Sequence, residues 1–368
     1  MTRIHEVDAV RGFALAGILV ANIGFFADPR YAVSLGTMPI SEGPVALLVS
    51  TLVLSKFYVI FSFLFGYSFT LQMRSDTWKP AQTIRRCLGL FVLGVAQGLL
   101  LWIGDILTLY AALGLILLAL RNIRPRTAVI IGCSIIGVWT LLWLGLAALT
   151  LLEPAAAAPA ADVAAGLRAE QLFTDGPLGV LRFQAETYPM LAAFVWIGQG
   201  PMALALFLFG LAAGKSGLFE RPLPSWIMWA GYGVGLPAAV FVTWSSQQGE
   251  ALELVGAAVN NVTSLPLAAA YVVTLLRLRS IHGVLAPAGR MAASNYIGQS
   301  VLACLVFSGY GLALAGKLAP VAVMGVAALI YTVLLVFSAW WMRGHANGPI
   351  EAGLRAFTRY SAAPLQRR

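Results

Sequence analysis

The chain has 368 residues, of which 60% are hydrophobic and only 11% are charged. A water-soluble domain of this composition would expose a very large apolar surface, so the composition excludes an ordinary soluble protein and predicts an all-α integral membrane protein. The net charge of +9 does not indicate a nucleic-acid partner, because the basic residues lie in short clusters between apolar runs.

Apolar runs in chain order predict about ten membrane-spanning helices, since a span needs about 20 mostly apolar residues. We place them at residues 10–26, 53–73, 87–103, 105–120, 127–152, 190–213, 226–245, 252–276, 291–316 and 319–342. Residues 43–52 are expected to add a shallow interfacial helix before the second span. The whole chain, 1–368, then forms a single transmembrane domain in contact with the lipid bilayer.

The distribution of basic residues predicts the orientation of the bundle. With the N-terminus in the cytoplasm, only five of the 24 basic residues fall on the outer side, namely Arg30, Lys56, Arg168, Arg182 and Lys317. Because inner loops carry the excess of Lys and Arg, both termini are predicted to be cytoplasmic, with 343–368 as a short cytoplasmic C-terminal segment. We therefore expect a multi-pass protein of an inner (plasma) membrane.

Segment 153–189 is the longest connection between predicted spans, and it is expected to face outward. Apolar residues at helical intervals between Asp162 and Glu186 predict an interfacial helix there. Such a helix would serve as a lid over an outer cavity or as a plain connection between spans.

The first span carries polar groups that hydrocarbon does not favour. Asp8 and Arg11 share one helical face at its start, and Asn22 follows about three turns later. A cap and a positive anchor would explain the first pair, and a hydrogen bond between helices would explain Asn22. A polar site within the bundle would explain all three. Asp28 follows in the first outer loop.

Two further groups of polar residues fall within or beside predicted spans. Lys56 opens the second span, and Gln97 and Asp105 flank the tip of the hairpin between the third and fourth spans. The alternatives are a lysine that reaches toward water and an aspartate that caps the next helix. In the ninth span, Asn295 and Gln299 lie one turn apart, either as links between helices or as a lining of a cavity.

Basic residues near the inner ends of the spans are candidates for binding phosphate. Arg85, Arg86 and Arg290 carry guanidinium groups, which bind phosphate in a bidentate manner. Glu351 and Arg355 are spaced as an ordinary surface ion pair, which contributes little stability. We predict no metal site, because the three histidines and three cysteines lie far apart in the sequence.

Five ordered motifs resemble the YeiB family of bacterial membrane proteins, also called domain of unknown function 418. They are Asp8 to Leu15, Phe61 to Gly66, Gly104 to Leu107, Gly289 to Ser300, and Gly348 to Arg355. That family is remotely similar to transmembrane acyltransferases, including the acyltransferase 3 and heparan-α-glucosaminide N-acetyltransferase groups. The resemblance implies an acyl-CoA donor and a sugar-like or other small acceptor. It carries over Asp8, Arg11 and Asn22 through the first-span pattern.

The chain departs from the acyltransferase pattern at its catalytic position. The first outer loop, 23–44, contains no histidine, and Gln97 stands where many relatives have one. Asp105 or Asp28 would then act as general base, with Asn22 and Lys56 orienting the acceptor or stabilising the oxyanion. The alternatives are a transporter or exporter of a small organic solute that uses the same polar groups, and a non-catalytic membrane partner. An oligomer is compatible with each.

Overall fold

The computed structural model describes residues 5–33, 43–74, 78–152 and 163–359, and this part of the chain is helical without any strand. Eight segments are long and apolar enough to cross a membrane: α1 (His5–Ala27), α2 with α3 (Gly43–Met73), α4 (Pro80–Leu100), α6 (Pro125–Leu152), α8 (Gly176–Ser216), α9 (Ser225–Ser245), α10 (Glu250–Arg277) and α13 (Pro320–Gly344). Two shorter apolar helices are α5 (Leu107–Ala119) and α12 (Ala292–Phe307). The predicted fold class is confirmed. Ten spans and the side of the termini stay predictions.

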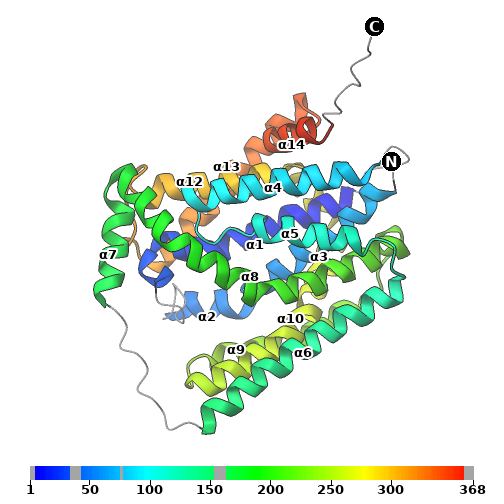
Figure 1. The fold of residues 1–368 in the computed structure, drawn as a ribbon, viewed down its shortest axis with the longest axis horizontal. Helices are drawn as coiled ribbons and strands as arrows, with labels where there is room; N and C mark the ends of the chain where they lie inside the picture. Colours follow the sequence, from blue (N-terminus) through cyan, green and yellow to red (C-terminus); the bar gives the residue numbers. More distant parts are fainter. Residues whose placement is uncertain (1–4, 34–42, 75–77, 153–162, 360–368) are drawn as a thin grey trace.

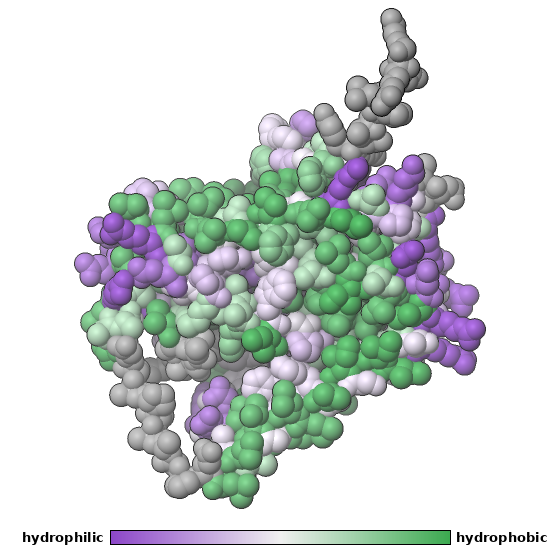
Figure 2. All heavy atoms as spheres, viewed as in Figure 1, coloured by the Kyte–Doolittle hydropathy of each residue, from purple (hydrophilic) through white to green (hydrophobic). Residues whose placement is uncertain are grey.

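The long helices run roughly side by side, with α4 and α12 at one side of the bundle and α6, α9 and α10 at the other (Figure 1). Helix α1 lies inside and packs against α3, α12, α13 and the short α11 (His282–Arg290), while α8 packs against α3 and α6. In Figure 2 apolar side chains cover the middle of the visible face, and hydrophilic ones gather at its two ends. This pattern is the one expected for a protein surrounded by hydrocarbon.

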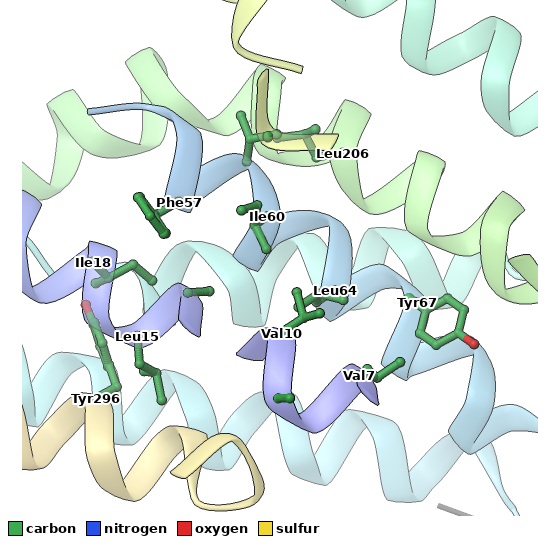
Figure 3. Close-up of a cluster of buried hydrophobic side chains, with 14 of the residues drawn as sticks. Val7, Val10, Leu15, Ile18, Phe57, Ile60, Leu64, Tyr67, Leu206 and Tyr296 are labelled. Carbon is green, nitrogen blue, oxygen red and sulfur yellow. The ribbon is translucent and has the colours of Figure 1, made fainter. Parts of the chain in front are cut away.

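Glycines allow α1 to approach other helices closely. A Cβ atom at Gly289 of α11 would collide with the backbone oxygen of Asp8, and one at Gly12 would collide with that of Leu285. Small residues at such crossings are typical of helix packing in membranes. Further along α1, Leu15 and Ile18 belong to the same buried core as Ile60 of α3, which is shown in Figure 3.

A break separates the predicted short helix 43–52 from the second predicted span. Helix α2 (Gly43–Leu52) covers the first, and α3 (Lys56–Met73) covers most of the second, after a turn in which Ser55 has a positive φ of 71°. The interfacial position of α2 stays a prediction. The ninth span also differs from its predicted end, because α12 stops at Phe307 and the chain then folds back beside it through backbone hydrogen bonds such as Leu314 to Val306. A Cβ atom at Gly311 would collide with the backbone oxygen of Leu305, so glycine at this position permits the close return of the chain.

The predicted outer loop contains α7 (Val163–Thr174), while residues 153–162 lie outside the described part. Helix α8 begins at Gly176, well before the predicted start at 190. Hydropathy indicates where a helix enters hydrocarbon. The first turns of α8 precede that point and include polar residues such as Arg182 and Glu186. The remaining short helices are η1 (Pro29–Ala32), η2 (Leu218–Glu220), η3 (Arg279–Ile281) and α14 (Pro349–Arg359).

Candidate functional site

The polar pair at the start of α1 joins a buried Asp8 to a partly buried Arg11 and connects two helices. The Asp8 side chain accepts from Arg11 at 2.6 Å, and Asp8 is only 2% exposed. The second guanidinium nitrogen of Arg11 donates to the Ser68 hydroxyl on α3. A buried charge needs such partners to offset its loss of hydration. The pair therefore fixes the Arg11 guanidinium at the junction of α1 and α3.

Beside this junction lies a cavity of about 520 Å³ at the end of the bundle where α1 begins. Its polar part is lined by four arginines from four helices: Arg11 of α1, Arg86 of α4, Arg290 of α11 and Arg355 of α14. Glu351 is the carboxylate-bearing residue among the lining residues. Toward the middle of the bundle the lining becomes apolar and aromatic, with Leu90, Leu107, Tyr110 and Tyr296. The cavity thus joins a cationic mouth to an apolar end.

Arg86 has no carboxylate within ion-pair distance among the described residues. Its guanidinium carbon lies 5.9 Å from the centre of the Phe65 ring, a cation–π contact. The charges that act on it are those of Arg11, Arg355 and Glu351. Several guanidinium groups facing one cavity repel one another, so the arrangement favours a bound anion.

Glu351 does not act simply as a surface ion-pair partner. Its carboxylate accepts from the backbone N–H groups of Ala293 at 2.7 Å and Ser294 at 3.2 Å, and from the Ser294 hydroxyl at 2.5 Å. These amides belong to the first turn of α12, where backbone donors lack helical partners and a negative charge is favoured. The carboxylate therefore attaches α14 to α12 at the edge of the cavity.

The three predicted amides lie inside the bundle and link helices. Gln97 donates to the Ser300 hydroxyl at 3.0 Å, and Gln299 donates to the backbone oxygen of Leu15 at 2.9 Å. Asn295 donates to the backbone oxygen of Ala288 and to the Ser338 hydroxyl, both at 2.9 Å. None of the three lines the arginine-rich cavity. These contacts fit the alternative of packing between helices.

Asp105 is 1% exposed and caps α5. Its two carboxylate oxygens accept from the backbone N–H groups of Leu107 at 3.0 Å and Thr108 at 2.9 Å. Leu107, one of these two donors, lines the apolar end of the cavity, whereas Asp105 itself is not a lining residue. Tyr296, also in the lining, lies within electrostatic reach of Asp105.

The remaining predicted residues lie elsewhere. Asp28 accepts from the Arg30 guanidinium at 2.6 Å and from the Arg30 backbone N–H, and this hydrogen bonding raises the pKa of Arg30 in the predicted first outer loop. The Lys56 ammonium lies 3.4 Å from the backbone oxygen of Ser50, near the C-terminal end of α2, where a positive charge is favoured. Asn22 is half-buried on α1 and makes no side-chain hydrogen bond within the described part.

The structure thus brings together Arg11, Arg86 and Arg290 from the predicted set, with Asp8 behind them, whereas Arg85 does not line the cavity. Sequence reasoning missed Arg355 and the cavity role of Glu351, although their spacing was visible. Their contacts with α4 and α12 depend on how α14 folds back. No group of three or more His, Cys, Asp or Glu residues that would hold a metal occurs in the described ranges.

The fold and the cavity define a polytopic, all-helical membrane protein with a basic chamber at one end. Residues 213–361 match the family described as "Protein of unknown function (DUF418)". The chain is 28% identical to the uncharacterized protein YxaH of Bacillus subtilis, over 100% of this chain and 96% of that protein. It is also 26% identical to the uncharacterized protein YeiB of Escherichia coli, over 99% and 98%. The chain is therefore similar to this family, in agreement with the resemblance of its motifs.

A third relative, an uncharacterized 39.9 kDa protein from the amylase 3' region of Bacillus acidopullulyticus, is 27% identical over 99% of this chain and 96% of its own length. No solved structure matches the chain. The matched family segment includes Arg290, Glu351 and Arg355, so three of the charged lining residues lie within it.

Proposed function

We propose that this protein is a membrane-embedded acyltransferase that takes an acyl group from acyl-CoA and transfers it to a small or sugar-like acceptor. The observation that carries the proposal is the cavity with four arginines, in which Arg86 faces other cations without a carboxylate partner among the described residues. Phosphate groups suit this mouth because guanidinium groups bind phosphate through paired, charge-assisted hydrogen bonds.

The shape of the cavity supports a donor with a charged head and an apolar end. From Gln82 to Leu90 the lining follows α4 for about 12 Å at about 1.5 Å per residue, from polar to apolar surroundings. Phosphates bound by Arg11, Arg86, Arg290 and Arg355 would direct the acyl thioester toward Leu107 and Tyr296. The donor would enter from the predicted cytoplasmic side of the inner membrane.

The reaction requires a base for the acceptor. In the proposed step, the acceptor oxygen or nitrogen forms a bond to the acyl carbon and gives its proton to a carboxylate, while the coenzyme A thiolate leaves and is protonated. Asp105 is the candidate nearest to the apolar end of the cavity. Burial of a carboxylate favours this role, but the two backbone hydrogen bonds of Asp105 must weaken as it accepts the proton.

Binding of coenzyme A to the purified full-length protein tests the donor site. Replacing Arg86 with Gln is expected to weaken binding about 10- to 100-fold, because a hydrogen bond to a charged group contributes about 1.5–3 kcal/mol. Arg279→Gln is the matched control, since Arg279 is exposed on η3 and is not part of the cavity lining. Equal binding by both variants and the original protein would reject the donor site. Acyl-CoA turnover that survives Asp105→Asn would reject Asp105 as base.

Transport of a small organic anion is the second candidate, and the interruption between α2 and α3 favours it. Interrupted helices with charged residues beside the break are common at the binding sites of transporters, and Lys56 is 2% exposed immediately after the turn at Ser55. Solute flux in proteoliposomes without any acyl acceptor, reduced by Lys56→Met, would support transport over acyl transfer.

A further inference from the structure

The C-terminal helix α14 forms one wall of the arginine-rich cavity from outside the bundle. It lies beyond α4 in Figure 1, and Glu351, Leu354, Arg355 and Thr358 contribute to the cavity lining. The Leu354 side chain packs over Gly89 of α4. Helix α14 is thus a separate element that covers one side of the cavity and packs against α4 and α12.

Glu351 is the polar attachment of this helix. Its carboxylate binds the first turn of α12, and the backbone N–H of Ile350 donates to the Ser294 hydroxyl oxygen at 3.0 Å. A Cβ atom at Gly348 would collide with the Glu351 carboxylate, so glycine at this position lets the carboxylate reach α12. The connection from α13 is also held, because the Trp341 indole donates to the backbone oxygen of Asn347 at 3.0 Å.

Arg355 lies one turn beyond Glu351, and its positive charge lies near those of other arginines. It reaches the same cavity as Arg86 and Arg11, and Arg86 experiences the positive charges of both. Docking of α14 therefore brings two opposite charges to the cavity, of which Glu351 is engaged by α12 and Arg355 lies near the other arginines. The positive charges of Arg355, Arg86 and Arg11 repel one another, and an anion between them would reverse this repulsion.

We propose that α14 is a lid that closes over a phosphate-bearing ligand, with Glu351 as its attachment to α12 and Arg355 as the residue that responds to the ligand. Closure and anion binding stabilise each other, as linkage requires of any ligand that favours one of two states. The identity of the ligand rests on the proposed function, in which the phosphates belong to acyl-CoA. Closure of the lid itself requires only a bound phosphate group.

Hydrogen–deuterium exchange of the α14 amides tests the lid in the full-length protein, with inorganic pyrophosphate and coenzyme A as separate probes. A bound probe is expected to slow exchange in α14 severalfold while exchange in α8 stays unchanged. Glu351→Gln is expected to speed α14 exchange about tenfold without ligand, because a charged acceptor of two amides is lost. Arg355→Gln should leave α14 docked but abolish the slowing by pyrophosphate. Glu250→Gln, at the exposed start of α10, is the matched control.

The outcomes separate the lid from the donor assignment. Slowing by pyrophosphate without binding of coenzyme A supports the lid and rejects the acyl-CoA donor. Binding of either probe with unchanged α14 exchange overturns the lid and leaves the donor assignment intact. Failure of both probes to bind overturns the anion site and the lid together. Unchanged exchange in α8 shows that each variant is folded.

Discussion

The crossing of α1 and α11 gives a sharp prediction, because a single methyl group has no room there. In Gly289→Ala the new Cβ would lie inside the contact distance of the Asp8 backbone oxygen and next to the Gly12 nitrogen. Both neighbours are backbone atoms of a buried helix, so α1 and α11 must separate. Overpacking of this kind costs about 1–3 kcal/mol, which exceeds the gain of up to about 1 kcal/mol from replacing glycine in a helix.

Thermal unfolding of the purified protein in detergent, followed by tryptophan fluorescence, measures this effect. Gly289→Ala is expected to lower the midpoint temperature. The matched control is Gly137→Ala in α6, where no atom lies within 4 Å of the added Cβ and stability should stay equal or rise. Because the same crossing positions Asp8 and Arg11, coenzyme A binding should also weaken in Gly289→Ala alone. Equal melting of the two variants would refute the close approach of α1 to α11.

The remaining predictions concern charged groups. Asp105→Asn should destabilise the protein by about 1–3 kcal/mol, because one amide oxygen replaces two carboxylate acceptors of buried N–H groups; Asp175→Asn, which loses no capping hydrogen bond, is the control in the same melting assay. Asp28→Asn should change stability by less than about 1 kcal/mol, as expected for an exposed ion pair, and a larger loss would show that the outer loop depends on Arg30. Raising the ionic strength from about 0.1 to about 1 M, which shortens the Debye length from about 10 to about 3 Å, should weaken pyrophosphate binding in the original protein more than in Arg86→Gln. Equal salt dependence would show that Arg86 does not face the anion.

Much of the fold was predictable because hydropathy reports directly on burial in hydrocarbon. Each of the ten predicted runs overlaps a helix, and the segment 43–52 coincides with α2. Helix ends were harder to predict. Helix α8 begins at Gly176, in a polar segment before the predicted start at 190, and α12 stops at Phe307, within an apolar run. Local backbone geometry and contacts with neighbouring helices decide these ends, and average hydropathy does not report them.

The candidate site was predictable only in part. The pairing of Asp8 with Arg11 follows from their spacing on one helix face, and it is observed at 2.6 Å. The cap formed by Asp105 was one of two alternatives that the sequence left open. Arg86 and Arg355 meet across separate helices, a contact that depends on the return of α14 toward α4. Adjacent Arg85 and Arg86 look equivalent in the sequence, but they point in different directions around α4, and only Arg86 reaches the cavity.

Helix α8 has a consequence for what the protein presents to its surroundings. Its 41 residues correspond to about 60 Å of helix, whereas the hydrocarbon of a bilayer is about 30 Å thick. The excess length of α8 packs against α7, and the Arg168–Glu186 ion pair joins the two helices. Val180 and Phe183 in the first turns of α8 are buried in the same core cluster as Ile23 and Phe307, so this part of α8 is an extension of the bundle and not an isolated helix. Such a packed extension offers proteases no exposed backbone to cut, in contrast to a loose connection of the same length.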